Sequence, residues 1–289
     1  MSKIKVSEIF RSIQGEGDKT GQLSIWVRFF GCNLKCGGFY QAEPTDASTY
    51  KKTVVDWTKV KKMADLPVFE YGCDSEYSWH PEYKKLVTKY KDADALVEDL
   101  KPFLYNNGTD WQHPITNNKI DLCFTGGEPM LQQAAMVDIM REVGCDDKEI
   151  TVQIETNGTK PIDRIFKDYC AETSHEIHFN ISPKMLNVSG EKNAVNYDNI
   201  LAYQELTTSG ILKFVINNDD RAWQELNRHV MKLRDMGVWL PIYVMPCGAT
   251  KEQQENSDVV SQIAERAIVN GYHVSGRLHC NIWGNAMGV

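Results

Sequence analysis

The fold is first indicated by Ser24-Ile25-Trp26-Val27-Arg28-Phe29-Phe30, an apolar run that passes directly into Gly31-Cys32. Branched and aromatic residues dominate this run, as they do in buried strands. Similar runs predict strands at residues 120–124, 150–154, 177–181, 211–216 and 240–245. Amphipathic patterns predict helices at residues 92–104, 131–143, 221–236 and 251–269. Alternating strands and helices predict an α/β fold with a parallel sheet, and six such units rather than eight predict an incomplete (β/α)6 barrel.

Polar motifs follow five of these strands directly. They are Gly31-Cys32, Thr125-Gly126-Gly127-Glu128-Pro129, Glu155-Thr156-Asn157-Gly158, Ser182-Pro183-Lys184 and Pro246-Cys247-Gly248. Each motif alone would fit an ordinary turn, because Gly, Pro and Asn are common turn residues. In (β/α) barrels, however, the site is assembled from the loops at the carboxyl ends of the strands. The recurrence of polar motifs at these ends predicts one shared pocket.

The composition is that of a globular protein with one core. The 289 residues carry a net charge of -7 and contain no basic stripe, which argues against a general nucleic-acid or anionic-membrane surface. The first residues form no apolar signal region, and no run of about 18 apolar residues appears. We therefore expect a single domain over residues 1–289 in the cytoplasm, where a reducing environment suits free cysteines.

Two cysteines stand at the end of the first strand, in Gly31-Cys32-Asn33-Leu34-Lys35-Cys36. Alone, this pair fits a zinc half-site or two small buried residues as well as it fits a metal cluster. A third cysteine, Cys73, opens a separate motif, Cys73-Asp74-Ser75, while Phe39 follows the pair without a further cysteine nearby. The remaining cysteines are predicted to be structural or incidental: Cys123, Cys145, Cys170, Cys247 and Cys280.

The cysteine loop and the Gly-Gly-Glu-Pro turn at residues 126–129 resemble the cluster loop and the methionine-binding loop of radical S-adenosylmethionine (SAM) enzymes. Three thiolates leave one iron of a 4Fe-4S cluster open to chelate SAM. The resemblance implies that the cluster ligands are Cys32, Cys36 and Cys73. It also implies SAM contacts from Gly72, Asp74, Gly127, Glu128, Ser182, Pro183 and Lys184. Standing alone, Ser182-Pro183-Lys184 would instead be interpreted as a turn with a solvated lysine.

A more specific resemblance is to the 7-carboxy-7-deazaguanine synthase family. It rests on Glu8-Ile9-Phe10-Arg11-Ser12-Ile13-Gln14-Gly15-Glu16-Gly17, on Cys73-Asp74-Ser75-Glu76-Tyr77-Ser78-Trp79 and on Arg277-Leu278-His279-Cys280-Asn281-Ile282-Trp283-Gly284. It covers nearly the whole chain outside residues 37–72, which are then an insertion between the second and third cluster cysteines. Closing such a loop costs only on the order of 2 to 3 kcal/mol. The insertion is expected either to cover the cluster mouth or to decorate the surface.

The family resemblance implies a ring contraction of 6-carboxy-5,6,7,8-tetrahydropterin to 7-carboxy-7-deazaguanine, with loss of ammonia. The radical comes from SAM, so no catalytic side chain is expected. Ser75 is implied as a ligand of Mg2+, which takes few protein ligands. Arg28 is implied to bind the substrate carboxylate, and Glu16 is implied to pair with the guanidine-like edge of the pterin. A buried turn or helix-capping role is the alternative for Glu16. The other implied substrate contacts are Ile13, Gln14, Gly15, Thr125, His279 and the terminal Val289.

The partners implied by the resemblance are a small pterin substrate, a flavodoxin-like reductant and a second copy in a homodimer. Two other functions stay open from the residues. One is a radical SAM activase of a partner protein, although such enzymes carry their third cysteine close to the first two. The other is a non-catalytic descendant that binds a protein through the insertion. Activity on the pterin would distinguish these three functions.

Overall fold

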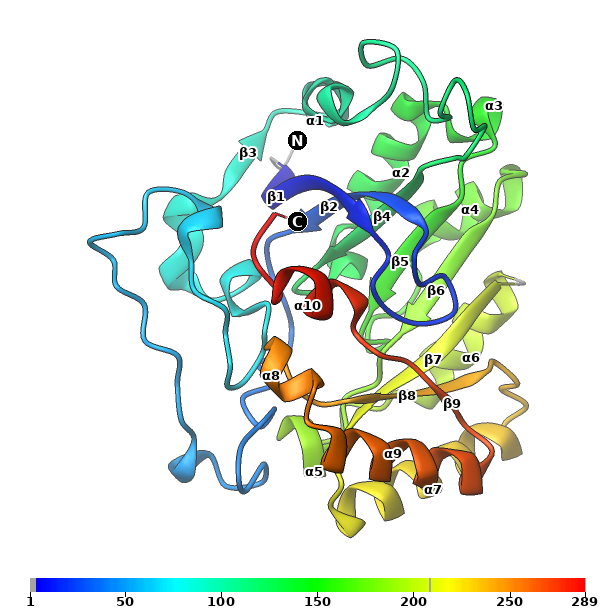
Figure 1. Cartoon of the computed structure of the whole chain (residues 1–289). Coiled ribbons are helices and arrows are strands. Elements are labelled where there is room, and N and C mark those ends of the chain that lie inside the picture. The colour runs from blue at the N-terminus through cyan, green and yellow to red at the C-terminus, as the bar shows by residue number, and fades with distance from the viewer. Residues whose placement is uncertain (1–3, 208, 289) are drawn as a thin grey trace.

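The computed structural model describes residues 4–207 and 209–288 (Figure 1). Within these residues the strands form one nine-stranded sheet in the order β3-β1-β2-β4-β5-β6-β7-β8-β9. The strands are β1 (Ile4–Ile13), β2 (Leu23–Phe29), β3 (Thr88–Tyr90), β4 (Asp121–Gly126), β5 (Val152–Thr156), β6 (Ile177–Ile181), β7 (Ser209–Ile216), β8 (Ile242–Pro246) and β9 (His273–Val274). Strands β2 and β4 to β9 pair in parallel, whereas β1 pairs antiparallel with both β2 and β3. The predicted α/β fold with a largely parallel sheet is confirmed.

Helices connect most of the parallel strands, as a parallel sheet requires. They are α1 (Ala93–Leu100), α2 (Gln133–Val143), α3 (Cys145–Lys148), α4 (Arg164–Glu172), α5 (Leu186–Ser189), α6 (Tyr197–Leu206), α7 (Asp220–Asp235), α8 (Lys251–Gln254), α9 (Ser257–Asn270) and α10 (Leu278–Trp283). Figure 1 shows α2, α4 and α6 on one side of the sheet and α10 on the other, near β1. No helix in the described part of the chain is long and apolar enough to cross a membrane.

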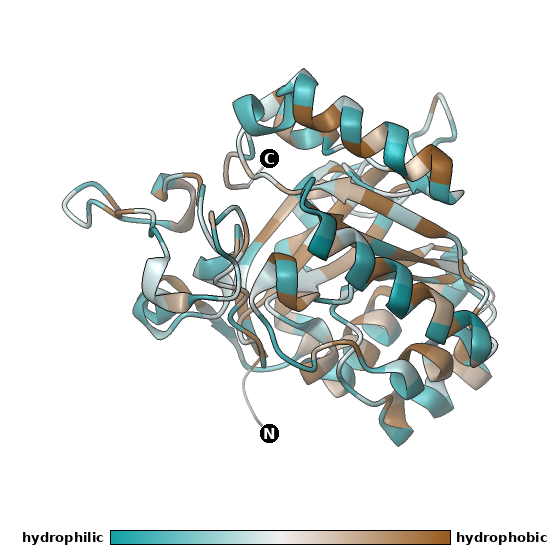
Figure 2. Cartoon of the chain, turned by 90° about the horizontal axis from the view of Figure 1, so that it is seen from below, coloured by the Kyte–Doolittle hydropathy of each residue, from teal (hydrophilic) through white to brown (hydrophobic). Residues whose placement is uncertain are grey.

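The main core lies between the sheet and the covering helices. Phe124 on β4 and Phe179 on β6 are fully buried, together with Trp223 and Leu226 on one face of α7. Figure 2 shows brown, apolar residues along the central strands and alternating brown and teal along the helices. Each fully buried large apolar side chain stabilises the fold by about 1.5 to 3 kcal/mol relative to exposure. This packing holds the strand ends in fixed positions relative to one another.

The structure differs from the predicted elements in several places. The predicted helix at residues 251–269 is two helices, α8 and α9, because the Asn256 side chain accepts a hydrogen bond from the Val259 N–H and caps α9. The opening segment was interpreted only as a motif, yet it forms β1 beside β2. The short strands β3 and β9 were also not predicted, since two or three residues carry little periodic signal.

Residues 37–72, called the 37–72 segment below, leave the sheet region as an extended excursion with the short 3-10 helices η1 (Ala47–Thr49) and η2 (Met63–Asp65) (Figure 1). Two further 3-10 helices, η3 (Glu76–Ser78) and η4 (Pro81–Leu86), follow the segment. The segment contributes to a second, smaller hydrophobic core, which is separate from the main one. It therefore packs against the rest of the chain instead of standing free in solvent.

Candidate active site

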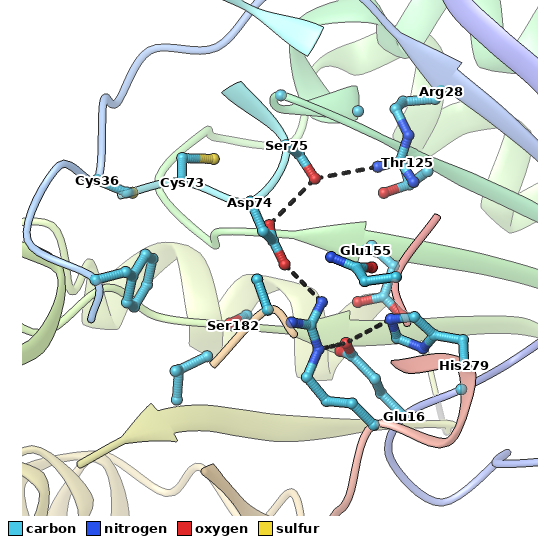
Figure 3. Close-up of a pocket in the computed structure, with 18 of the residues that line it drawn as sticks. Glu16, Arg28, Cys36, Cys73, Asp74, Ser75, Thr125, Glu155, Ser182 and His279 are labelled. Atoms are coloured by element: carbon cyan, nitrogen blue, oxygen red, sulfur yellow. Dashed lines mark hydrogen bonds and ion pairs between the residues drawn. The ribbon is translucent and has the colours of Figure 1, made fainter. Parts of the chain in front are cut away.

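The polar motifs at the strand ends border one pocket (Figure 3). Among the predicted site residues, those that line it are Ile13, Gln14, Gly15, Glu16, Arg28, Cys32, Cys36, Gly72, Cys73, Asp74, Ser75, Thr125, Gly127, Ser182, Lys184 and His279. Parallel strands end at the same edge of a sheet, which is why motifs far apart in sequence meet here. Glu128 and Pro183 do not line the pocket, and Val289 lies outside the described residues.

Three free cysteines, Cys32, Cys36 and Cys73, form what we call the cysteine end of the pocket. Burial raises the pKa of Cys32 to about 11 and that of Cys73 to about 12. Burial also raises the pKa of Cys36, which Lys184 partly opposes. These thiols are therefore protonated near neutral pH unless a positive charge stabilises the thiolates, as a bound metal does.

The loop that carries Cys32 and Cys36 is held in place through its backbone N–H groups. The N–H groups of Lys35 and Cys36 both donate to the Glu191 carboxylate, at 2.7 and 2.6 Å. Cys36 has a φ of 51°, a left-handed conformation that is uncommon outside glycine. A carboxylate from a distant loop thus fixes an otherwise unfavourable turn beside the cysteine end.

Gly127 lies directly against this loop. A Cβ atom at position 127 would lie 2.4 Å from the Gly31 carbonyl oxygen and 2.7 Å from the Cys32 Cβ. No side chain fits in that space. The adjacent Glu128 N–H donates to the same Gly31 oxygen at 2.8 Å. The Gly-Gly-Glu-Pro turn is therefore packed onto the cysteine loop by backbone contact.

Glu128 has a structural position that the family resemblance did not indicate. Its buried carboxylate accepts hydrogen bonds from the Met130 N–H at 2.9 Å, the Thr156 hydroxyl at 2.7 Å and the Asn157 N–H at 2.7 Å. These bonds join the 3-10 helix η6 (Pro129–Gln132) to the end of β5. Glu128 thus joins two loops that border the pocket, but its own side chain is buried and does not line the pocket.

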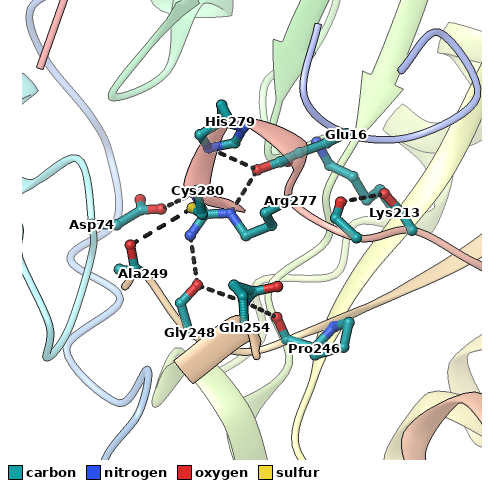
Figure 4. Close-up of polar contacts among 12 residues, drawn as sticks. Glu16, Asp74, Lys213, Pro246, Gly248, Ala249, Gln254, Arg277, His279 and Cys280 are labelled. Carbon is teal, nitrogen blue, oxygen red and sulfur yellow. Dashed lines mark hydrogen bonds and ion pairs between the residues drawn. The ribbon is translucent and has the colours of Figure 1, made fainter. Parts of the chain in front are cut away.

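Five ionic side chains of the pocket, Glu16, Asp74, Glu155, Lys213 and Arg277, form what we call the charged cluster, which begins at Asp74 beside Cys73 and extends away from the cysteine end (Figures 3 and 4). Lys213 Nζ lies 2.5 Å from Glu16 and 2.8 Å from Glu155. Arg277 lies 2.8 Å from Glu16 and 2.5 Å from Asp74. Every charge is thus paired, as buried charges must be.

Glu16 is the centre of this cluster. Burial by itself would raise the pKa of Glu16, but Lys213 and Arg277 outweigh it and hold that pKa well below its usual range. Both carboxylate oxygens already accept from protein cations, one from Lys213 and one from Arg277. The predicted pairing of Glu16 with a pterin edge would therefore have to be shared with these two partners.

Arg28 is held in place from two sides. Its Nε donates to Glu8 at 2.7 Å, and its Nη1 donates to the Ser75 hydroxyl at 3.4 Å. The Tyr77 hydroxyl donates to the same Glu8 oxygen at 2.9 Å. A guanidinium carries five N–H donors. Because Arg28 lines the pocket, its remaining donors are available to a ligand.

His279 lies close to Gly15 and Glu16, in the turn that follows β1. Its Nε2 lies 3.9 Å from Glu16, and a Cβ atom at Gly15 would lie only 2.0 Å from its Nδ1. Burial, helped by the nearby Arg277, lowers the pKa of His279 to about 4. The imidazole is therefore neutral near pH 7. It can donate one hydrogen bond and accept another.

Comparisons with known proteins found relatives over nearly the whole chain. No protein-family model matches the chain. A 7-carboxy-7-deazaguanine synthase from Hyperthermus butylicus is 27% identical over 280 residues, which cover 96% of this chain and 91% of that protein. One from Pyrobaculum aerophilum is 25% identical over 290 residues, covering 99% and 97% of the two chains. A third, from Nitratidesulfovibrio vulgaris, is 31% identical over 157 residues, covering 54% and 56%.

Over nearly its whole length the chain is thus similar to 7-carboxy-7-deazaguanine synthases. The crystal structure of QueE from Escherichia coli covers 96% of this chain and 95% of its own, with a TM-score of 0.56 and 16% identity. At that identity the likeness shows the fold alone. The likeness extends over nearly the whole chain, so the two proteins share a mixed α/β architecture.

Whether the cysteine end of the pocket suits an iron-sulfur cluster is a question of donor chemistry. Within residues 4–207 and 209–288, no group of three or more His, Cys, Asp or Glu side chains stands close enough together to hold a metal ion. The donor types nevertheless fit, because three free thiols border one pocket and Figure 3 shows Cys36 and Cys73 at the same end of it. Holding a cluster would require the three sulfurs to draw together.

Several pocket residues were given no individual site role from the sequence, although all but Lys213 stand in motifs quoted above. They are Glu8, Glu155, Lys213, Arg277 and Cys247. Lys213 had a signal, since it is the only charged residue in the apolar run 211–216. Cys247 was predicted to be structural or incidental, yet it lines the pocket directly after β8. Arg277 had no comparable signal, because its partners lie in distant parts of the chain.

Proposed function

We propose that the protein converts 6-carboxy-5,6,7,8-tetrahydropterin into 7-carboxy-7-deazaguanine with loss of ammonia, as a radical SAM lyase of 7-deazapurine biosynthesis. The observation that carries this proposal is the two-ended pocket. Three cysteines border one end, and Arg28 with the charged cluster borders the other. An anionic, nitrogen-rich substrate and an iron-sulfur cofactor need such different surroundings within reach of each other.

In this proposal Cys32, Cys36 and Cys73 hold a 4Fe-4S cluster, and Gly127, Ser182 and Lys184 border the SAM beside it. When bound, the cluster and SAM supply the radical chemistry that starts the reaction. The nine-stranded sheet is then the wall of an incomplete (β/α)6 barrel. Residues 37–72 are its insertion between the second and third cysteines.

The chain's own residues bind and orient the pterin. Arg28 presents free guanidinium N–H groups to the substrate carboxylate, because Glu8 and Ser75 accept hydrogen bonds from only some of its N–H groups. Lys213 stays protonated: burial would lower its pKa, but Glu155 and Glu16 raise it. Neutral His279 offers a hydrogen bond to a pterin edge without adding charge.

Mg2+ is proposed at Ser75. The Ser75 hydroxyl donates to Asp74 at 3.2 Å, so a hydroxyl and a carboxylate oxygen lie together at the pocket wall. Both are the hard oxygen ligands that Mg2+ prefers, and the substrate carboxylate and water would complete its shell. A flavodoxin-like reductant and a homodimer are part of the same proposal.

Anaerobic reconstitution tests this function. The protein is loaded with iron and sulfide and then incubated with SAM, dithionite, Mg2+ and the carboxypterin. We expect 7-carboxy-7-deazaguanine and ammonia in equal amounts, measured by mass spectrometry and an ammonia assay, and omission of Mg2+ should slow their formation. SAM cleavage that required an added protein partner and gave no deazaguanine would favour the activase function instead.

A further inference from the structure

The 37–72 segment has a core of its own. Met63, Leu66 and Phe69 from the segment are buried there together with three residues from outside it, Tyr77, Tyr83 and Met287. Phe69 is 1% exposed, and Met287 from the closing tail is 9% exposed. The segment therefore joins the residues just after Cys73 to the far end of the chain, by apolar packing.

Aromatic contacts and hydrogen bonds connect this core to Arg28, the residue proposed to bind the substrate carboxylate. Phe69 stacks on Tyr77 with ring centroids 5.9 Å apart, and it meets Tyr83 edge-on at 5.7 Å. The Tyr77 hydroxyl donates to Glu8 at 2.9 Å, and the same Glu8 oxygen accepts from Arg28 Nε at 2.7 Å. Arg28 also lies over the Tyr77 ring, 5.6 Å from its centroid. Tyr77 thus contacts both members of the Glu8–Arg28 pair.

A second connection runs to the closing tail. Met287 is buried in the small core and also borders the pocket, as do its neighbours Asn285, Ala286 and Gly288. A Cβ atom at Gly288 would lie 3.9 Å from Glu8, so the tail passes beside the Glu8–Arg28 pair. Burying the Met287 side chain in the segment core keeps this part of the tail at the pocket.

We propose that the 37–72 segment is a positioning element for the substrate carboxylate. Phe69 acts through Tyr77 to orient Arg28, and Met287 holds the closing tail beside the Glu8–Arg28 pair. The proposal rests on the proposed function in naming a carboxylated pterin as the ligand. A guanidinium binds a carboxylate well only when both planar groups are aligned, and packed aromatic rings hold such alignment at low entropic cost. Phe69 does not line the pocket, and Tyr77, which borders it, acts as a positioning residue through its contacts with Glu8 and Arg28.

The other end of the segment is anchored independently, near the cysteine end. The Gly38 N–H donates to the Ser189 carbonyl at 2.9 Å, and Arg221 on α7 pairs with Glu43 at 3.2 Å. These contacts do not involve Phe69 or Tyr77. A change at Phe69 should therefore alter Arg28 without releasing the cysteine loop, which separates an effect on the carboxylate from an effect on the cluster.

The test compares two ligands on the metal-free full chain: 6-carboxypterin and a pterin without the carboxylate. Tyr77→Phe keeps the ring and removes only the hydroxyl that bonds Glu8. Phe69→Ala removes the ring beneath Tyr77, and Met287→Ala removes the tail anchor. Val54→Ala is the matched control, since Val54 lies in the same segment and is 88% exposed. Calorimetry gives Kd for each ligand, and thermal unfolding shows whether each variant is folded.

We expect Tyr77→Phe and Phe69→Ala to weaken 6-carboxypterin binding by about fivefold and about tenfold, and Met287→Ala to weaken it by about threefold. Binding of the pterin without the carboxylate, and of both ligands to Val54→Ala, should stay within about twofold of wild type. In the reconstituted protein, iron content and the KM for SAM should stay unchanged. Equal weakening of both ligands, or unchanged binding of 6-carboxypterin to Tyr77→Phe, would overturn the proposal. A wild-type protein that fails to prefer 6-carboxypterin would instead reject the proposed function.

Discussion

Arg277 forms an ion pair with Asp74, with Nη2 and Oδ2 2.5 Å apart, although 203 positions separate the two residues in the chain. The same guanidinium donates from Nε to Glu16 at 2.8 Å and from Nη1 to the Gly248 carbonyl at 2.6 Å. Arg277, near the end of the chain, thus joins Glu16, near its start, to Asp74, which follows Cys73. Stability and substrate affinity should therefore both depend on it.

Replacing Arg277 should leave two carboxylates without their shared cation. We expect Arg277→Met to lower the free energy of unfolding of the metal-free protein by about 3 kcal/mol, measured by urea denaturation. Arg277→Lys should lose less, because an ammonium reaches one carboxylate but cannot span both. Equal stability of Arg277→Met and wild type would mean that the pair contributes nothing net.

The three cysteines of the cysteine end should be needed together. Cys32→Ala, Cys36→Ala and Cys73→Ala should each abolish the visible absorbance of the reconstituted cluster and SAM cleavage, since two thiolates do not hold a 4Fe-4S cluster in place. Cys247→Ala is the sharpest control, because Cys247 lines the same pocket. Cys145→Ala controls for a buried thiol outside it. A cluster that survives in Cys73→Ala but not in Cys247→Ala would transfer the third ligand to Cys247.

Arg28→Lys should weaken pterin binding selectively. A lysine keeps the charge but cannot contact Glu8, Ser75 and a carboxylate at the same time. We expect binding of the carboxypterin to weaken by roughly 1.5 to 3 kcal/mol, the scale of a charge-assisted hydrogen bond. SAM affinity serves as the internal control and should stay constant. Unaltered kinetics on the carboxypterin would remove Arg28 from the substrate site.

Gly127→Ala should disturb the cysteine loop. The added Cβ would overlap the Gly31 carbonyl at 2.4 Å, so the Gly-Gly-Glu-Pro turn and the loop must separate. We expect a loss of about 1 to 3 kcal/mol in unfolding free energy and poor iron incorporation on reconstitution. Gly276→Ala is the matched control, because a Cβ there meets nothing within 4 Å. Normal iron content in Gly127→Ala would show that the loop can move aside without harm.

His279 should make the folded protein less stable in mild acid. Its pKa is lowered from 6.5 to about 4 in the folded state, so the unfolded chain binds the proton more readily. Its contribution to stability is therefore complete above about pH 6.5 and is lost as the pH falls toward about 4. Urea denaturation across this range should show a steeper fall for wild type than for His279→Gln. Parallel pH profiles for the two proteins would contradict this assignment.

The positions of the main strands and the meeting of their polar ends could be predicted from the sequence. The run 177–181 is rich in apolar residues and is buried throughout, because both faces of a central parallel strand are covered. Parallel strands then deliver their ends to one edge, which brings Cys32, Gly127 and Ser182 to one pocket. Local residue patterns carry this information, so no knowledge of distant contacts was needed.

The pairing within the pocket was decided only by the tertiary structure. Glu16 meets Lys213 across 197 positions and Arg277 across 261, and nothing local to any of these residues indicates a partner. Sheet order and the path of the closing segment bring them together, and burial then requires their charges to pair. Met287 likewise has its place because the 37–72 segment folds a small core around it. The polar residues at the strand ends could thus be predicted from the sequence, whereas the partner of each charged side chain depended on the packing of segments far apart in sequence.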